Sequence, residues 1–434
     1  MPVIKSYTEK INKSEFGKNI LTLTSGTALA QIIPFLFYPV IARIFTPAEF
    51  GLLETLTAII SIITEFSSGK YELGILVAKT KQDATNLVGV VVFLSFFVLT
   101  SVYLVLQLFF ADFLSQTLNE PHLKKWLFVC PIAAFSIIIY NTYNEWCVRN
   151  GYFKKLAINK IINTSAITLN KLLLGFVKIF SQGLVVGDMM GRLISAGTCV
   201  FRFLQKDTAA LKEITVTQIK KIAKEFVEFP KFIMPGRLLN VIGQQLPVLF
   251  LGLYFNAVEV GYFAMTMLVF SVPVNVIGFA VKDVFRQRAN EEFKKTGNCL
   301  KIYIKVLKIL SIIAAIGALL LILFLPVIFS IFLGNQWTTA AYYAQILTIQ
   351  ILLSFVSTSV FDVIIIVNRL RINLLWQIYF AGVTFLSLWI GCALFNDIII
   401  ALYCFVIGRS SAFVLSIILS YHYAKGNLLK KQTV

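Results

Sequence analysis

The residues best placed to do chemistry in this 434-residue chain are charged side chains inside long apolar segments. Lys171, Arg192, Arg237 and Arg409 each fall well inside one such segment. An ionisable group at bilayer depth is costly unless it faces protein or water, so each is a candidate functional residue. Arginine offers a planar fork of donors and lysine a point charge, and both suit phosphate-like anions. We therefore expect these cations to bind an anionic head group.

Purely structural roles stay open for two of these cations. Asp188 and Arg192 are four residues apart on one predicted helix face and can neutralise each other. Arg409 can form an ion pair with Asp362, whereas Arg237 and Lys171 have no acidic partner in their own segments.

Composition identifies the elements that must position these residues. The chain is 58% hydrophobic and 14% charged, with a mean hydropathy of +0.82, which excludes a soluble globular protein. Apolar blocks long enough to cross a bilayer predict an all-α integral membrane protein with about 12 transmembrane helices. The predicted spans are 19–44, 48–67, 84–111, 126–147, 157–181, 184–204, 229–254, 258–281, 299–329, 338–367, 372–394 and 397–422.

The connecting segments alternate in charge. One set holds 25 Lys and Arg residues and the other set holds two, Lys124 and Lys125. Because short basic loops stay in the cytoplasm, both termini are predicted to be cytoplasmic. The net charge of +18 then reflects topology and acidic lipid, and we expect no nucleic-acid partner.

An internal repeat and the long connecting segment at 205–228 suggest two halves. We expect cytoplasmic tails at 1–18 and 423–434, six-helix lobes at 19–204 and 229–422, and a cytoplasmic linker at 205–228. A Glu-x-Gly pattern at Glu49 and Gly51 recurs at Glu259 and Gly261, an offset of 210 residues, and favours an internal repeat. Ordinary helix capping and a tight turn are the alternative explanation.

Span 229–254 has an unusual composition. Gln244 and Gln245 offer amide groups near Arg237 and join the candidate head-group site. Prolines remove backbone hydrogen bonds from membrane helices, which favours bending where a helix lines a cavity. The candidate hinge residues are Pro34, Pro39, Pro230, Pro235, Pro247 and Pro273.

The sequence lacks the residue patterns of metal sites, catalytic sites and nucleotide-binding sites. The six cysteines form no CxxC pair, there are only two histidines, and no phosphate-binding loop motif is present. We therefore expect no metal site, no cofactor, no catalytic residues and no ATP hydrolysis.

Four short motifs carry a resemblance to a known family. They are Arg43 to Gly51 (RIFTPAEFG), Lys70 to Leu76 (KYELGIL), Glu259 to Ala264 (EVGYFA) and Phe332 to Trp337 (FLGNQW). Together they resemble the polysaccharide transporters of the multidrug/oligosaccharidyl-lipid/polysaccharide exporter superfamily. The resemblance implies two six-helix lobes around a central cavity, with alternating access.

The resemblance implies a flippase for an undecaprenyl-pyrophosphate-linked oligosaccharide in the bacterial inner membrane, serving O-antigen or other surface polysaccharide synthesis. Implied partners are membrane lipids and the polysaccharide polymerase and chain-length machinery. Transport would be driven by a proton or sodium gradient, with Glu54, Glu65 and Asp362 as coupling candidates. The alternatives are a cation-coupled multidrug exporter and a membrane-embedded polysaccharide polymerase or ligase.

Overall fold

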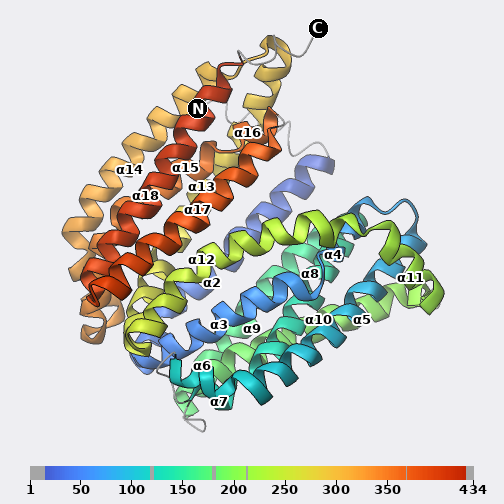
Figure 1. Cartoon of the computed structure of the whole chain (residues 1–434). Helices are drawn as coiled ribbons and strands as arrows, with labels where there is room; N and C mark the ends of the chain where they lie inside the picture. Colours follow the sequence, from blue (N-terminus) through green and yellow to red (C-terminus); the bar gives the residue numbers. More distant parts are fainter. Residues whose placement is uncertain (1–14, 118–121, 178–181, 212–213, 368, 427–434) are drawn as a thin grey trace. The chain divides into compact units, whose positions relative to one another are not determined.

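The computed structural model describes residues 15–117, 122–177, 182–211, 214–367 and 369–426, and every regular element within these ranges is helical (Figure 1). Each of the 12 predicted spans coincides with one long helix or a run of consecutive helices. The prediction of an all-α membrane protein is therefore confirmed. The predicted tails lie partly outside the description, at residues 1–14 and 427–434.

In the described residues, nine helical segments are long and apolar enough to cross a membrane. Three predicted spans are missing from these nine, and they correspond to α9, α12 and α13. Among the described side chains, α13 has a shorter apolar stretch, Ala257–Phe270. Lysines and asparagines interrupt α9, and Arg237 with three side-chain amides interrupts α12, so these two helices need partners other than lipid.

Residue contacts divide the chain into two compact units. Unit 1 comprises Met1–Phe45 and Leu56–Leu238, and unit 2 comprises Thr46–Thr55 and Leu239–Val434. The boundary lies within α12, whereas the sequence predicted it in the linker at 205–228. That linker is itself largely helical, because α10 extends to Leu211 and α11 follows.

Unit 1 holds the helices up to the first turns of α12. Their bounds are α2 Glu15–Ile44, α3 Pro47–Ser67 (from Leu56 onward), α4 Tyr71–Val77, α5 Lys81–Val105, the π-helix η1 Leu106–Phe110, α6 Ala111–Thr117, α7 Leu123–Trp126, α8 Val129–Arg149, α9 Phe153–Val177, α10 Gly183–Leu211, α11 Val216–Glu225, the π-helix η2 Phe229–Ile233 and α12 Met234–Tyr254. The helix α9 packs between α2 and α10, and α8 packs against α5 and α10.

Small residues bring α9 and α10 close together. A Cβ atom added at Gly187 or Gly191 would lie 2.7 Å from the Lys171 Cα or 2.3 Å from the Ile167 Cα. Only glycine permits this approach of two helix backbones, as the Gly-x-x-x-Gly spacing predicts. The contact sets Lys171 of α9 directly beside Asp188 of α10.

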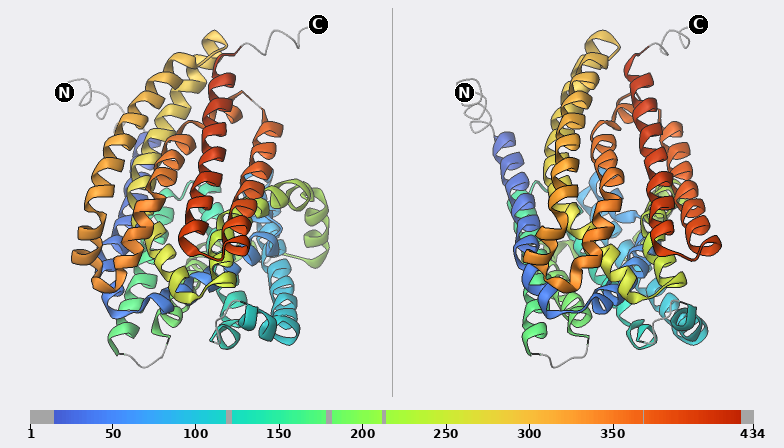
Figure 2. Two further views of the ribbon diagram at one scale, coloured as in Figure 1. Left: turned by 60° about the vertical axis from the view of Figure 1, so that its left-hand side comes forward. Right: turned by 90° about the vertical axis from the view of Figure 1, so that its left-hand side faces the viewer.

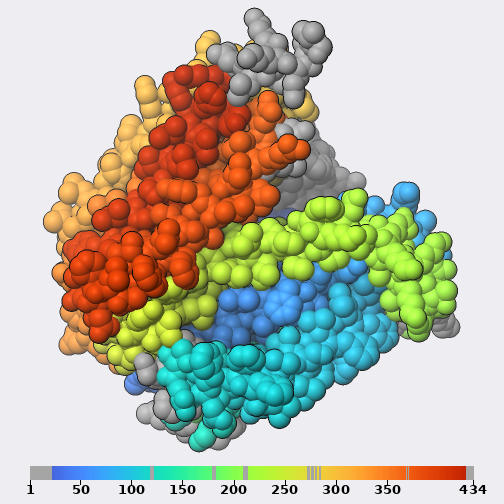
Figure 3. Space-filling model, in the orientation of Figure 1, coloured from blue at the N-terminus to red at the C-terminus, as the bar shows by residue number. Residues whose placement is uncertain are grey.

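The amphipathic helix α11 lies on the surface of unit 1 beside α5 (Figure 3). Thr215 caps it by accepting a hydrogen bond from the Gln218 amide at 3.3 Å. Ile222 is buried, whereas Lys220, Lys221 and Lys224 are exposed. This distribution suits a helix with one face on protein and a basic face turned outward.

Unit 2 contains the remaining helices and the first turns of α3. Their bounds are α13 Ala257–Thr296, α14 Leu300–Ile328, the π-helix η3 Phe329–Leu333, the short 3₁₀-helix η4 Asn335–Trp337, α15 Thr338–Val360, α16 Val363–Ile366, α17 Leu370–Trp389, the π-helix η5 Ile390–Leu394 and α18 Ile398–Ala424. The helix α15 packs against α13, α14 and α18 at the centre of this unit, and α14 also contacts α13 and α18 (Figure 2).

Both units use the same order of neighbours. In unit 1, α8 packs between α5 and α10; in unit 2, α15 packs between α14 and α18. These are the third, fourth and sixth long helices of each half of the chain. The shared order supports the internal repeat that the Glu-x-Gly pattern predicts.

The repeated motifs meet each other within unit 2. A Cβ atom added at Gly51 would lie 1.7 Å from the Ala257 carbonyl oxygen, and one added at Gly261 would lie 1.8 Å from the Pro47 carbonyl oxygen. Position 47 corresponds to 257 and position 51 to 261 at the 210-residue offset. The first turns of α3 and α13 therefore cross with local two-fold symmetry.

Each of these crossing helices begins with a side-chain cap. The Glu49 carboxylate accepts hydrogen bonds from the Thr46 amide at 2.8 Å and the Thr46 hydroxyl at 2.9 Å, and the Asn256 side chain accepts one from the Glu259 amide at 3.1 Å. Trp337 is fully buried and packs edge-on against Phe50, with ring centroids 5.1 Å apart. Residues from three of the four quoted motifs thus build one structural junction.

The predicted hinge prolines lie in helices of different regularity. Pro34 and Pro39 lie inside α2, Pro247 lies inside α12, and Pro273 falls within α13, where its side chain is outside the description. Pro230 lies in the π-helical turn η2, and Pro235 is in the first turn of α12. The entry to α12 is therefore the irregular one, and the hinge roles stay predictions.

Candidate functional site

Asp188 is the centre of a buried charge cluster between α9 and α10. Its carboxylate lies 2.8 Å from the Lys171 Nζ and accepts a 2.5 Å hydrogen bond from the Arg192 Nε. Asp188 and Lys171 are 5% and 7% exposed. Lys171, which has no acidic partner in its own helix, thus has one on the neighbouring helix.

This cluster limits the predicted anion-binding role of Lys171 and Arg192. The Asp188 carboxylate interacts with both cations. The buried Lys171 ammonium lies 2.8 Å from Asp188 and therefore has little capacity left to bind a ligand. The structure thus supplies a sufficient structural reason for both cations, and their role in substrate binding stays a prediction.

Arg409 of α18 is held by aromatic rings. Its guanidinium lies 4.6 Å from the centre of the Phe380 ring and 5.2 Å from that of Phe405. Asp362, its proposed ion-pair partner, instead lies 3.4 Å from the Lys282 Nζ. The pairing of Arg409 with Asp362 is therefore wrong, because α13 brings Lys282 to that carboxylate first.

Arg237 has the most open environment of the four predicted cations. It lies in the first turns of α12, its side chain is exposed, and no described carboxylate forms an ion pair with it. It interacts electrostatically with Glu145 of α8. Arg237 therefore has the greatest capacity to accept an anionic ligand.

The predicted head-group residues are divided between the two units. Lys171, Arg192 and Arg237 belong to unit 1, whereas Arg409, Gln244 and Gln245 belong to unit 2. Gln244 is exposed and donates a hydrogen bond to the Asn240 side chain at 2.7 Å, and Gln245 is half-buried.

Glu65 and Asp362, two of the predicted coupling acids, lie beside lysines. Glu65 lies 2.8 Å from the Lys70 Nζ, and Asp362 pairs with Lys282. Glu54 is half-buried in α3. The coupling roles of all three stay predictions.

A second charge cluster surrounds Lys70, and sequence reasoning missed it. Lys70 is 7% exposed, and its Nζ lies between Glu65 at 2.8 Å and Glu72 at 3.4 Å. The segment 68–83 was predicted as a plain cytoplasmic loop because it is short and basic. The KYE sequence directly after Ser67, Ser68 and Gly69 was the available signal, since three consecutive polar groups beside apolar helices need partners.

The fold supports this cluster from three sides. Gly69 and Lys70 both have positive φ angles, 56° and 59°, so the chain reverses tightly into α4. Arg149 donates hydrogen bonds to the carbonyl oxygens of Ile75 at 2.9 Å, Ala78 at 2.6 Å and Thr80 at 3.0 Å, which satisfies the C-terminal end of α4. The Tyr71 hydroxyl donates to the Ala223 carbonyl of α11 at 2.9 Å.

Burial also raises the pKa of the Tyr71 phenol, so it stays a neutral donor at physiological pH. Glu72, the next residue in the chain, is buried in unit 1, with 4% of its surface exposed.

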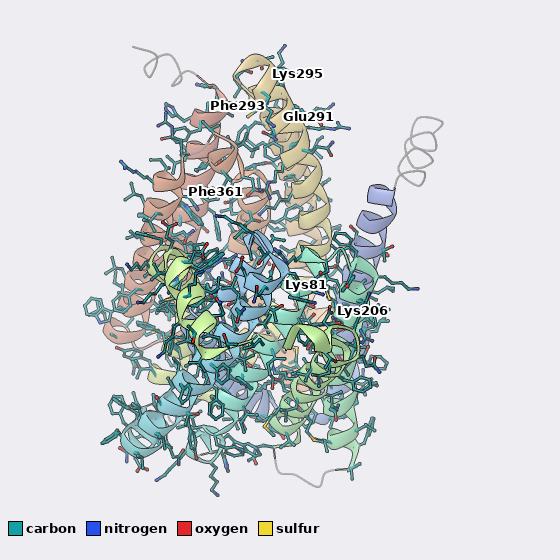
Figure 4. All side chains as sticks on the ribbon, turned by 90° about the vertical axis from the view of Figure 1, so that its right-hand side faces the viewer. Lys81, Lys206, Glu291, Phe293, Lys295 and Phe361 are labelled. Carbon is teal, nitrogen blue, oxygen red and sulfur yellow. The ribbon has the colours of Figure 1, made fainter. Side chains whose placement is uncertain are left out.

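Asp207 is a third buried acid of unit 1. Asp207 accepts a 3.1 Å hydrogen bond from the Trp146 indole and lies 3.4 Å from the Lys81 Nζ, a lysine labelled in Figure 4. The α10 backbone is non-helical at Asp207, with φ −121° and ψ 22°. This contact ties α5, α8 and α10 together and explains the kink as a structural feature.

Comparison with solved structures identifies the fold. The chain matches an inward-facing multidrug resistance MATE family transporter of the MOP superfamily at 13% identity and a TM-score of 0.62, with 95% of each chain covered. It matches the lipid II flippase MurJ in an inward closed conformation at 12% identity and a TM-score of 0.68, covering 93% of this chain and 87% of that one. A MOP superfamily transporter from Pyrococcus furiosus, described as having a binding pocket of reversed polarity, matches at 13% identity and a TM-score of 0.60, covering 95% and 96%. At these identities the matches show the fold alone.

Sequence comparison identifies the family. A search of curated proteins gave no match. The family model described as "Polysaccharide biosynthesis protein" matches residues 40–342, which include the crossing of α3 and α13, the Lys70 cluster and Arg237. The chain therefore belongs to this polysaccharide biosynthesis family and has the fold of MOP superfamily transporters.

Proposed function

We propose that the protein is a flippase that moves a polyprenyl-pyrophosphate-linked oligosaccharide across the bacterial inner membrane by alternating access. The proposal rests on the environment of Arg237. Its side chain is exposed and forms no ion pair with a carboxylate among the described residues. Its helix, α12, is not among the nine described helical segments that are long and apolar enough to cross a membrane. A guanidinium in that setting favours a diphosphate, which it can bind through two parallel hydrogen bonds. Family membership supplies the link to polysaccharide synthesis.

A cation-coupled multidrug exporter is the alternative within the same fold. MATE transporters share this architecture. The exposed guanidinium of Arg237 favours an anion over an organic cation, so this alternative ranks second. A polysaccharide polymerase or ligase ranks third, since the matched folds belong to transporters and flippases.

The proposed setting follows the topology. We propose that both termini lie in the cytoplasm and that the lipid-linked substrate is passed to a polysaccharide polymerase with its chain-length machinery. An ion gradient, of protons or sodium, is proposed to drive transport.

Transport in vesicles tests the proposal. Purified protein is reconstituted and supplied with a defined polyprenyl-pyrophosphate oligosaccharide or with a labelled drug cation. We expect translocation of the oligosaccharide and loss of at least tenfold in rate for Arg237→Gln, because a bidentate contact to diphosphate contributes more than ~1.4 kcal/mol.

Arg286→Gln is the matched control, since Arg286 is also an exposed arginine but lies in the basic C-terminal part of α13. Figure 4 labels Glu291, Phe293 and Lys295 further along that end of the helix. Transport of the drug cation without the oligosaccharide would overturn the proposal in favour of the multidrug exporter.

A further inference from the structure

An apolar groove lies within unit 1 between α5, α8 and α10, and we call it the α8 groove. It has a cavity volume of about 280 Å³ and an almost entirely apolar surface. Its lining includes Val88 and Val92 of α5, Phe135 and Trp146 of α8, and Val200 and Phe203 of α10. The Thr142 hydroxyl in its wall donates to the Ile138 carbonyl at 2.7 Å, so this polar group is already satisfied. The groove therefore suits a hydrocarbon chain.

The groove opens on an apolar surface. Val200 and Leu204 of α10 line it and are themselves exposed, and Phe201 between them is 60% exposed. Large apolar side chains gathered on the surface of a membrane protein contact lipid rather than water. The molecules available to fill the groove are therefore the lipids of the bilayer.

The length of the groove matches one leaflet. Phe135 and Trp146 are its outermost lining residues on α8 and are 11 residues apart, which is about 16 Å of helix. The hydrocarbon core of a bilayer is about 30 Å thick, so one leaflet supplies about 15 Å. An acyl chain that enters at the Trp146 end thus fills the groove within its own leaflet. A second cavity continues from Phe135 toward Tyr103, so a longer polyprenyl chain that fills both cavities is the alternative occupant.

The groove ends beside a charged pair. Trp146, in the groove lining, donates to the Asp207 carboxylate at 3.1 Å, and the Lys81 Nζ lies 3.4 Å from the same carboxylate. Asp207 is buried, whereas the Lys81 side chain is 61% exposed. The charges of this pair compensate each other, so any further cation beside it adds surplus positive charge.

Two further lysines share one aromatic ring next to this pair. The Lys206 Nζ lies 3.9 Å from the centre of the Tyr152 ring, and the Lys155 Nζ lies 5.0 Å from the same centre. Lys206 directly precedes Asp207 in α10 and, like Lys81, is labelled in Figure 4. Neither the Lys155 nor the Lys206 ammonium forms an ion pair with a carboxylate in the part of the chain that the structure describes. A contact with the face of a ring leaves N–H donors of an ammonium available, so both lysines can bind a phosphate.

We propose that unit 1 binds an anionic phospholipid at this place, with the phosphate at Lys155 and Lys206 and one acyl chain in the α8 groove. The second acyl chain stays in the bilayer. Basic groups at the ends of membrane helices attract anionic lipid head groups, and the proposed topology puts this end of α8 on the cytoplasmic side. A lipid that binds the folded protein between three helices also stabilises their packing. The site is separate from Arg237 and does not depend on the proposed transport.

Native mass spectrometry of the full chain in detergent tests the head-group site. The probes are dioleoyl phosphatidylglycerol, which is anionic, and dioleoyl phosphatidylcholine, which is zwitterionic. We expect the wild type to bind phosphatidylglycerol at least tenfold more tightly. A Lys155→Gln and Lys206→Gln double variant should bind it about 30-fold more weakly than the wild type, because each lysine near a lipid surface contributes about fivefold.

The matched control is a Lys294→Gln and Lys295→Gln double variant, which removes two exposed lysines of α13. It should bind phosphatidylglycerol within about twofold of the wild type, since these lysines lie at the end of another helix. Equal weakening by the two double variants would reduce the binding to unspecific charge attraction and would overturn the inference.

A variant that fills the groove tests the position of the acyl chain. Val200→Trp places an indole at the groove lining, and we expect at least a tenfold loss of affinity for phosphatidylglycerol and no rise of its unfolding midpoint on addition of this lipid. Ile194→Trp is the control, because Ile194 is also exposed on α10 but lines neither cavity. Wild-type affinity of Val200→Trp contradicts the proposed position of the chain.

A photoactivatable lipid tests the site without any substitution. Phosphatidylglycerol with a diazirine on one acyl chain is added to the wild type at one molecule per protein, and the crosslinked peptides are identified. We expect adducts on α5, α8 and α10 around the groove, and few on α14, whose Leu319 is 63% exposed. Equal labelling of α14 overturns the inference. Loss of the groove adducts in excess geranylgeranyl pyrophosphate would assign the groove to a polyprenyl chain and also overturn it, whereas a failure to transport oligosaccharide leaves these expectations unchanged.

Discussion

The two units differ in how some of their buried charged side chains are compensated. Unit 1 pairs its buried charges in networks: Asp188 with Lys171 and Arg192, Lys70 with Glu65 and Glu72, and Asp207 with Lys81 and the Trp146 indole. Unit 2 also contains an ion pair, between Lys282 and the buried Asp362, but α17 and α18 contain no acid, and Arg409 of α18 lies over two aromatic rings. The shared order of helices therefore does not dictate how each charge is compensated.

The largest expected effect is the removal of the shared acid in unit 1. Asp188→Asn removes the carboxylate that contacts both the buried Lys171 ammonium and the Arg192 guanidinium, so we expect destabilisation by about 3–5 kcal/mol. The measurement is the midpoint of thermal unfolding in detergent. Asp112→Asn is the control, because Asp112 forms an exposed ion pair with Lys124 and should have almost no effect. Equal stability of the two variants would show that the Asp188 cluster is not a structural network.

A smaller effect is expected from widening the contact between α9 and α10. Gly191→Leu places a side chain against the Ile167 backbone, and we expect a loss of about 1–3 kcal/mol from overpacking. Gly382→Leu in α17 is the matched control, since an added Cβ at Gly382 meets no atom within 4 Å. Unfolding midpoints of the two variants in the same detergent give the comparison. A loss as large at Gly382 as at Gly191 would contradict the close packing of unit 1.

The smallest stability effect is expected in unit 2. Arg409→Met removes a cation–π contact and also the cost of a poorly solvated charge, so the two contributions nearly cancel and stability should change by no more than about 1 kcal/mol. Unfolding and vesicle transport are measured on the same preparation. If stability is unchanged but transport is lost, the result supports a role of Arg409 in binding the head group. A large loss of stability would show that the aromatic contact is structural.

The sequence predicted the helices better than it predicted the site. Apolar length and loop charge identify each span from local information, and all 12 spans coincide with helices. Ion pairs depend on which helices become neighbours. Asp188 reaches Lys171 across 17 residues of sequence because two glycines admit the α9 backbone, and no periodicity within either helix shows this.

The Lys70 cluster was missed for a different reason. A short basic loop is normally solvated, and the positive φ angles at Gly69 and Lys70 that turn this one inward are not encoded by hydropathy. Arg237 was identified from its type and depth. Its interaction with Glu145 required the folded arrangement of α8 and α12.

The crossing of Gly51 and Gly261 has an evolutionary consequence. An isologous contact, in which the same patch occurs on both sides, is what two identical subunits make around a two-fold axis. A six-helix ancestor carrying this motif would have met its own copy through it, and duplication with fusion would have kept the contact within one chain. In such an ancestor one codon change altered both sides of the contact at once. In the fused chain, mutation and selection act on each glycine separately, and both glycines are still present.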